Sequence, residues 1–334
     1  MKRTAFLFAA LLGVSACGGN DDGPVVEMVV PQGATFAQVI DSLMAREIIS
    51  SPTAFKIYAR VKGADRGVKA GRYALTTGGS WSSTLERLTR GSVVTVPMTI
   101  PEGFRLAQMV PRIAEITGAD ESDVLERLES TDGLPEVPGP TLEGYLFPDT
   151  YRFARGVSVE AVVTTMIERY QSMWTPERRA RLAELGMTET ELVALASIIQ
   201  AEARHVEEMP TISSVYHNRL RDGWLLQADP TVQYALGVQR ERLLYAAIDS
   251  VADNPYNTYT QRGLPPGPIG SPGELAIEAA LNPTAEDFMF FVARPDGSHV
   301  FTRTLGEHNR AKNASRRELD RLARDAAAGR SPQQ

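Results

Sequence analysis

The sequence lacks several residue patterns on which common catalytic centres depend. Cys17 is the only cysteine among 334 residues, so no disulfide can form within the chain. The four histidines match no zinc-binding spacing, and neither a G-x-S-x-G nucleophile elbow nor a glycine-rich phosphate loop occurs. We therefore expect neither a metal nor a cofactor.

An excess of positive charge is also missing. The formal net charge is −6, which argues against a nucleic-acid partner because phosphate binding needs a basic face. Hydrophobic residues make up 43% of the chain, enough to bury a sizeable core. A chain of this length favours two domains over one.

The N-terminus has the pattern of an export signal, and no apolar run there reaches membrane-spanning length. Lys2 and Arg3 precede an apolar stretch of about 12 residues, Ala5 to Ala16, where a spanning helix needs about 20. The stretch ends at Cys17 in a sequence that resembles the bacterial lipobox, so residues 1–16 are predicted to be a signal peptide and Cys17 the lipidated residue. The alternative is a short uncleaved anchor. Both place the body of the protein outside the cytoplasm, tethered to a membrane.

Local patterns predict an α+β protein. Strands are expected at Val25–Val30, Gly71–Leu75 and Ser92–Ile100, with helices between them. The segment Thr131–Pro140 is rich in proline and glycine and is a candidate linker or turn region.

A weak repeat lies in the first part of the chain. Val30-Pro31-Gln32-Gly33 with Ala37-Gln38-Val39-Ile40 returns as Ile100-Pro101-Glu102-Gly103 with Ala107-Gln108-Met109-Val110. In each copy, a strand enters a Pro-x-Gly turn and then an amphipathic helix. Such units often look alike, but the pattern is also typical of a LysM-like module that grips peptidoglycan sugars. We expect this module at residues 25–130.

A catalytic domain with a helical core is predicted at residues 141–325. Thr188-x-x-Glu191 is a capping box that opens a helix, and Ser271-x-x-Glu274 is expected to open another. The segments 288–292 and 299–302 flank Pro295-Asp296-Gly297 and predict a C-terminal β-hairpin.

Glu202 is the strongest candidate for catalysis. The apolar stripe Leu192, Leu195, Ile199 continues at Glu202 by steps of three and four. A carboxylate on a partly buried face has a raised pKa and can serve as a general acid for glycosidic cleavage. The alternative is that the stripe leaves the core here and Glu202 is solvated.

Further along, polar side chains suited to sugars gather in the sequence. Asp229 is also an alternative N-cap for the helix at Pro230, and the segment Leu142–Tyr151 is on composition more often a core strand and turn than a groove. The candidates that could hydrogen-bond or stack on a sugar are Gln227, Asp229, Asn257, Tyr259 and Gln261.

Five ordered motifs between residues 142 and 269 resemble the endolytic murein transglycosylase family (the MltG/YceG-like proteins). The resemblance extends more weakly back to about residue 25, where that family carries a LysM-like domain. The motifs are Leu142-Glu143-Gly144 through Phe147-Pro148-Asp149-Thr150-Tyr151, Leu195-Ala196-Ser197-Ile198-Ile199-Gln200-Ala201-Glu202, Ser214-Val215-Tyr216-His217-Asn218-Arg219-Leu220, Leu226-Gln227-Ala228-Asp229-Pro230-Thr231-Val232, and Tyr256-Asn257-Thr258-Tyr259 with Gly263-Leu264-Pro265-Pro266-Gly267-Pro268-Ile269.

The resemblance implies specific roles. The family's catalytic glutamate is the second acid of an E-K-E sequence, which falls on Glu202, while the first acid is replaced by Gln200. Asn218 and Glu143 stand in matching motifs and join the candidates for substrate binding. The family usually has an N-terminal transmembrane helix, whereas this chain has a lipobox.

The implied reaction is cleavage of the β-1,4 bond between N-acetylmuramic acid and N-acetylglucosamine with a 1,6-anhydro end as product. Peptidoglycan strands and cell-wall synthases are the implied partners, at the bacterial inner membrane with the catalytic domain in the periplasm. Two alternatives stay open: a hydrolytic muramidase with Asp229 or Glu143 as second carboxylate, and a non-catalytic peptidoglycan-binding lipoprotein.

Overall fold

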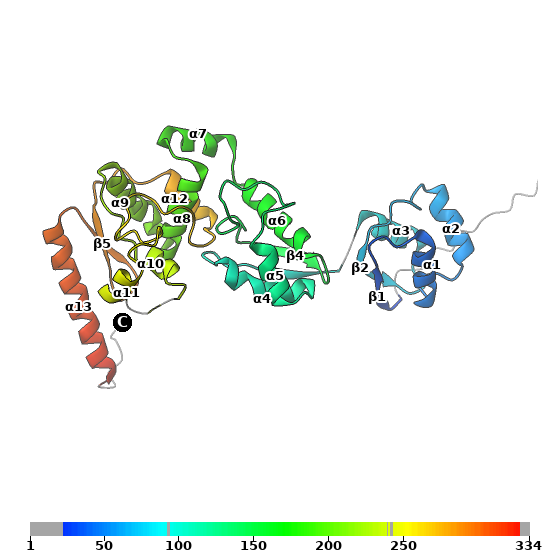
Figure 1. The fold of residues 1–334 in the computed structure, drawn as a ribbon. Helices are drawn as coiled ribbons and strands as arrows, with labels where there is room; N and C mark the ends of the chain where they lie inside the picture. Colours follow the sequence, from blue (N-terminus) through cyan, green and yellow to red (C-terminus); the bar gives the residue numbers. More distant parts are fainter. Residues whose placement is uncertain (1–22, 92–93, 239, 241–242, 328–334) are drawn as a thin grey trace, which may run out of the picture. The chain divides into compact units, whose positions relative to one another are not determined.

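The computed structural model describes residues 23–91, 94–238, 240 and 243–327, which form two compact units (Figure 1). The first unit contains the described residues up to Val96 together with Arg152–Val157. The second contains Pro97–Tyr151 and the chain from Ser158 onward. Cys17 lies outside the described residues. Within them, no helix combines the length and apolar character needed to cross a bilayer.

The first unit is a two-stranded sheet packed against three helices. Strands β1 (Val25–Val30) and β2 (Gly71–Thr76) are antiparallel, with Val25 opposite Thr76 and Val30 opposite Gly71. The helices are α1 (Phe36–Ala45), α2 (Pro52–Val61) and α3 (Trp81–Arg90). Side chains from all five elements close a small core that includes Met28, Leu43, Phe55, Tyr73 and Leu88.

Strands β3 (Thr95–Thr99) and β4 (Thr150–Ala154) pair with each other, and the division between the units falls within both. The helices α4 (Leu106–Thr117) and α5 (Glu121–Leu128) belong to the second unit. The division falls earlier in the chain than residues 131–140, the segment predicted to be a linker or a turn region, because α4 and α5 pack with α6 rather than with the first unit's core.

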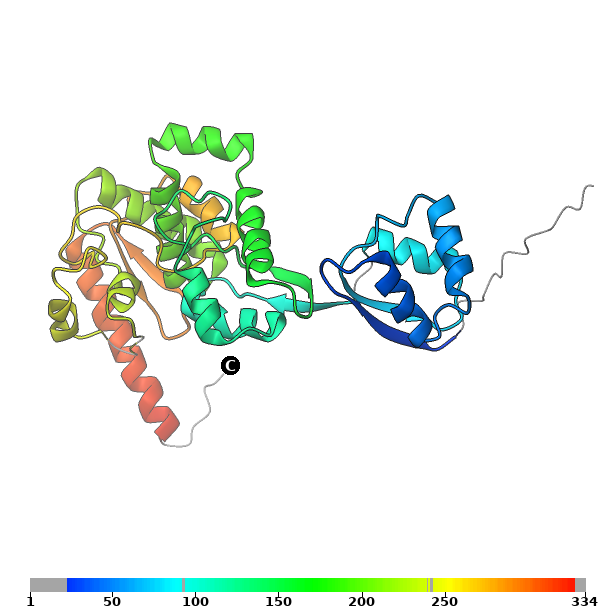
Figure 2. The same ribbon diagram turned by 45° about the vertical axis from the view of Figure 1, so that its right-hand side comes forward.

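The rest of the second unit is mostly helical, with one antiparallel hairpin near its end. Figures 1 and 2 show α13 beside this hairpin, which it contacts through both strands. The elements are α6 (Val159–Gln171), α7 (Pro176–Leu185), α8 (Glu189–Glu202), the 3-10 turn η1 (Val206–Glu208), α9 (Met209–Arg221), α10 (Asp229–Ala235), α11 (Tyr245–Ser250), α12 (Glu274–Leu281), β5 (Phe290–Ala293), β6 (His299–Thr302) and α13 (Leu305–Ala327).

Helix α8 is the centre of the second unit. The predicted capping box is present: the Thr188 side chain accepts from the Glu191 amide, and Glu191 accepts from the Thr188 amide at 2.8 Å. Every residue from Leu192 to Ile199 is buried, because α9, α10 and α12 pack around the helix. The expected one-sided stripe is therefore buried all round, and only the first and last turns of α8 reach solvent.

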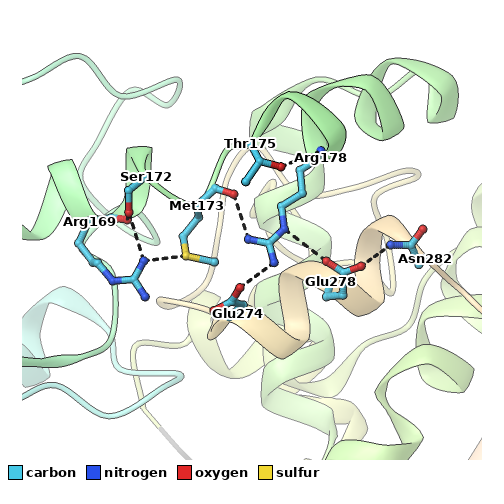
Figure 3. Close-up of polar contacts among 8 residues, drawn as sticks. All are labelled: Arg169, Ser172, Met173, Thr175, Arg178, Glu274, Glu278 and Asn282. Carbon is cyan, nitrogen blue, oxygen red and sulfur yellow. Dashed lines mark hydrogen bonds and ion pairs between the residues drawn. The ribbon is translucent and has the colours of Figure 1, made fainter.

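Arg178 connects α7 to α12, the helix that packs most extensively on α8. Its guanidinium donates to Glu274 at 2.7 Å, to Glu278 at 3.3 Å and to the Met173 carbonyl at 3.0 Å (Figure 3). Asn282 holds the other oxygen of Glu278 at 2.6 Å. These contacts fix the position of α12 at both its first and second turns.

The mixed α+β class and the C-terminal hairpin are confirmed, with three local corrections. Gly273, not Ser271, is the N-cap of α12, and no side chain caps it. The N-cap of α10 is Ala228, so Asp229 is already the first helical residue. The short helices α5 and α11 were not predicted from the sequence.

Candidate active site

A cleft of about 390 Å³ opens at the C-terminal end of α8. Its walls come from α8, α9, the segment leading into α10, the loop after α11, the β5–β6 hairpin and the start of α13. Four of the predicted residues line it together: Glu202, Gln227, Asp229 and Tyr259. The fold thus brings together side chains that are up to 57 positions apart in the sequence.

Glu202 is the last residue of α8 and is only partly exposed. The Tyr216 hydroxyl donates to its Oε1 at 3.1 Å. Burial, and then the negative charge of Asp229, raise the pKa of Glu202 from 4.5 to about 7, although the Tyr216 hydrogen bond and the charge of Arg219 oppose the rise. Near neutral pH, this carboxyl can therefore both give and take a proton.

Asp229 is fixed by a neighbour from a distant segment. The Tyr259 hydroxyl donates to Asp229 Oδ1 at 2.5 Å. Burial and this bond to an anion raise the pKa of Tyr259, so its proton stays on the phenol. Among the described residues, the other carboxylate oxygen of Asp229 has no hydrogen-bond partner.

Gln227 stands at a strained turn. Its φ of 49° is in the left-handed region, which non-glycine residues rarely adopt and which often marks functional sites. Thr258 holds the turn in place, since its carbonyl accepts from the Gln227 amide and its hydroxyl from the Ala228 amide, both at 3.0 Å. The Gln227 side chain is exposed at the cleft.

Arg219 was not selected from the sequence, although it lies in a quoted motif. It is largely buried, lines the cleft, and donates to the carbonyls of Met289 at 2.8 Å and Leu226 at 2.6 Å. It therefore joins α9 to the hairpin on one side and to the Gln227 segment on the other. The available signal was its spacing: Tyr216 and Arg219 are three apart on α9 and share a face.

The hairpin wall was also missed, because nothing local in the sequence says where a hairpin folds back. Phe290, Phe291 and His299 line the cleft. Glu208 holds His299 by accepting from its backbone amide at 2.9 Å and lying 2.7 Å from Nδ1. An aromatic wall thus faces the acid on α8.

Three predicted substrate-binding residues, Asn257, Asn218 and Glu143, do not line this cleft. Asn257 is buried and donates to the carbonyls of Ile248 and Val251. Asn218 is buried and donates to the carbonyls of Glu286 and Phe288. Both side-chain amides therefore donate to backbone carbonyls and stabilise loops.

Glu143, the third, is buried elsewhere in the second unit. It accepts from the Leu106 amide at 3.2 Å and from the Tyr234 hydroxyl at 3.5 Å. Burial raises the pKa of Glu143 to about 7, although these hydrogen bonds and the charge of Arg105 lower it. Gln261 also lies outside the cleft and donates to the Ala252 carbonyl. Within the described ranges, no cluster of three His, Cys, Asp or Glu side chains could hold a metal.

The fold and the site define an α+β protein with one acid–base carboxyl at the edge of a polar and aromatic cleft. The chain belongs to the YceG-like family, whose model matches residues 28–314. It is similar to an endolytic murein transglycosylase of Bacillus subtilis (strain 168), with 34% identity over 311 residues, covering 88% of this chain and 85% of that protein.

Two further relatives agree with this assignment. An endolytic murein transglycosylase of Streptococcus pneumoniae serotype 2 (strain D39) is 28% identical over 321 residues, covering 85% of this chain but only 57% of that protein. A crystal structure of a YceG-like protein from Listeria monocytogenes matches with a TM-score of 0.59 and 30% identity, covering 86% of this chain and 99% of that one.

Proposed function

We propose that this protein is a lytic transglycosylase that cleaves the β-1,4 bond between N-acetylmuramic acid and N-acetylglucosamine in peptidoglycan strands. The observation that carries the proposal is the placement of Glu202 in a polar cleft with a pKa of about 7. The names of the relatives, endolytic murein transglycosylases, support the same substrate and reaction.

The reaction needs one carboxyl used twice. Glu202 first donates its proton to the glycosidic oxygen, which leaves as the hydroxyl of N-acetylglucosamine. The 6-hydroxyl of the muramic acid then bonds to its own anomeric carbon, and the resulting carboxylate of Glu202 takes the proton that this hydroxyl loses. No water is consumed, and the acid returns to its starting state.

Gln227, Asp229 and Tyr259 orient the strand in this proposal. Their amide, carboxylate and phenol supply hydrogen bonds, and alignment of the reacting groups lowers the barrier. The charge of Asp229 also favours the oxocarbenium-like centre. Phe290 and Phe291 offer apolar faces on which a sugar ring can pack.

We further propose that the enzyme acts within strands, next to cell-wall synthases, and terminates strand elongation. Lipidation at Cys17 after removal of residues 1–16 would anchor it at the inner membrane with its body in the periplasm. The region 25–130 is proposed to bind peptidoglycan in the manner of a LysM-like module.

Mass spectrometry of purified glycan strands tests the main proposal. The unaltered protein is expected to produce 1,6-anhydro ends, and Glu202→Gln to do so about 100-fold to 10,000-fold more slowly. Reducing ends instead of anhydro ends would indicate a muramidase that uses Asp229 as a second carboxylate. Strands left intact by both proteins would support a binding protein.

A further inference from the structure

A second cleft, of about 430 Å³, lies in the second unit and shares no lining residue with the Glu202 cleft. One side is formed by the turn at Glu102 and the first turn of α4, including Phe104, Arg105 and Gln108. The other side includes Ala201, Pro230 and Gln233. None of these residues takes part in the chemistry described above.

The two clefts adjoin along the chain at two places. Ala201 lines the second cleft and Glu202 the first, while Pro230 lines the second and Asp229 the first. Neighbouring Cα atoms are about 3.8 Å apart, so the end of α8 and the start of α10 border both clefts. The two clefts therefore lie on the same two backbone segments.

The second cleft carries fixed hydrogen-bond donors. The side-chain oxygen of Gln108 accepts from the Arg105 amide at 2.9 Å, and that of Gln233 accepts from the Arg240 amide at 2.7 Å. Each side chain is thereby held in one orientation, while its NH₂ group has no partner among the described residues. Phe104 and Ile269 add apolar surface between these polar groups. A few fixed polar groups on an apolar lining are typical of a specific binding site.

The floor of this cleft is rigid. The Gly103 amide donates to the Ser271 carbonyl at 2.7 Å, and the Ser271 amide donates to the Phe104 carbonyl at 2.8 Å. A Cβ at Gly270 would lie 2.8 Å from the Gly103 carbonyl oxygen, so the close approach of the two backbones requires glycine. The turn is thus held by the loop that precedes α12, and a ligand would meet it already formed.

The equivalent turn of the first repeat, at Pro31-Gln32-Gly33, also borders a cleft, within the first unit. There Gln32, Gly33, Ala34 and Gln38 line a cavity of about 250 Å³, and the equivalent positions 102, 103, 104 and 108 line the second cleft. Gly33 and Gly103 have φ values of 77° and 76°, and Gln38 and Gln108 make the same bond to the residue before their helix. The sequence repeat is therefore also a repeat of cleft geometry.

We propose that the second cleft is a further saccharide subsite, which holds amino-sugar units of the strand beyond those at Glu202. This inference rests on the proposed function. It assigns Gln108 and Gln233 as donors to the hydroxyl or N-acetyl oxygens of those units. It makes affinity depend on strand length.

Ala107 offers a way to fill the second cleft without touching the chemistry, because it is an exposed lining residue on α4. Ala107→Trp and the smaller Ala107→Leu are placed in the inert Glu202→Gln protein, beside Glu115→Trp at an exposed position on α4 outside the cleft. Binding of glycan tetrasaccharides and dodecasaccharides is measured by calorimetry. Circular dichroism verifies that each variant is folded.

Ala107→Trp is expected to weaken dodecasaccharide binding about tenfold, equivalent to about 1.4 kcal/mol, and to leave tetrasaccharide binding within about twofold. The leucine should give a smaller loss of the same kind, and the position-115 control none. Equal affinity of all variants for the long strand, or equal weakening for both lengths, would overturn the inference. The proposed function fails separately, if the unaltered protein makes no anhydro ends.

Discussion

At the scale of single residues, the pKa of Glu202 limits the pH range of cleavage. The first step needs the protonated acid, so its rate should fall as pH rises through about 7. Asp229→Asn removes one cause that raises this pKa while keeping an oxygen for Tyr259. We expect the alkaline limb of the pH–rate profile to move to lower pH.

Measured kcat/KM of this variant between pH 5 and 9 checks the expectation. Asp222→Asn, at an exposed position after α9, is the matched control. A limb that stays in place in Asp229→Asn would mean that Asp229 does not act on Glu202 through its charge.

Glu143 makes a second pH prediction, on stability. Its pKa is raised to about 7 in the folded state from 4.5, so the folded protein keeps this proton longer than the unfolded chain does. The free energy of unfolding should therefore fall as pH rises from 4.5 to about 7, by up to about 3 kcal/mol from this group. Glu143→Gln should remove that fall, since it keeps an acceptor for the Leu106 amide.

Urea unfolding at pH 5 and pH 8 measures the effect. Relative to the unaltered protein, Glu143→Gln should gain stability at pH 8 compared with pH 5, whereas Glu115→Gln, an exposed carboxyl on α4, should not. An identical pH dependence of the free energy of unfolding in all three proteins would mean that ionisation of Glu143 does not destabilise the fold.

Sequence patterns identified Glu202 as the residue of α8 that lies at a cleft. They did not identify which polar side chains are used up in hydrogen bonds to backbone carbonyls. Glu202, Gln227, Asp229 and Tyr259 do share one cleft. Asn257 and Asn218 carry the same chemical groups, yet both are buried and bonded to carbonyls. Loop carbonyls that need a donor become visible only when the chain is folded.

At the scale of elements, Arg178 should matter more than a surface ion pair. Its side chain is 18% exposed and serves two carboxylates of α12 and one carbonyl (Figure 3). Arg178→Ala is expected to lower the free energy of unfolding by about 1–3 kcal/mol. Arg221→Ala, with a side chain 66% exposed, should change it by less than about 0.5 kcal/mol.

Chemical unfolding of both variants gives the comparison. The pH at which cleavage is half-maximal should be the same in both, because neither arginine faces Glu202. Equal stability of the two variants would show that α12 is held by apolar packing alone.

Capping patterns predicted helix starts correctly where the backbone of the capping residue is not bonded to a distant segment. The predicted Thr188-x-x-Glu191 is a true capping box. Ser271-x-x-Glu274 reads alike but fails, because the Ser271 backbone is bonded to Gly103 and Phe104. Hydrogen bonds to a segment about 170 positions away cannot be predicted from a four-residue pattern.

At the scale of the whole molecule, each unit has its own core, and the tryptophans report on them separately. Trp81 packs on the first core and Trp174 belongs to the second. Leu88 is fully buried in the first unit. Leu88→Ala is expected to destabilise that unit by about 2–5 kcal/mol and to leave the unfolding of the second unchanged.

Fluorescence in urea follows this in proteins that keep only Trp81 or only Trp174, with the other tryptophans changed to phenylalanine. Leu195→Ala in α8 is the reciprocal control, which should move the Trp174 transition. Equal shifts of both transitions in either variant would mean that the two units unfold as one.

The presence of two units was foreseeable from length and composition, but their limits were not. Composition left the proline- and glycine-rich segment 131–140 open as a linker or a turn region, and it lies within the second unit. The pairing of β3 with β4 is what places residues 152–157 with the first unit, and pairing over more than 50 positions is not encoded in local composition.

That arrangement means that the peptide chain passes between the units at 96/97, at 151/152 and again at 157/158. A protease that nicked the chain once after Val96 would not release a self-contained N-terminal piece. The peptide 152–157 would stay on the C-terminal fragment, and Arg152 would still donate to Thr95 at 3.1 Å. The two fragments would therefore stay associated after the cut, as the halves of a split protein do, and would come apart only under denaturing conditions.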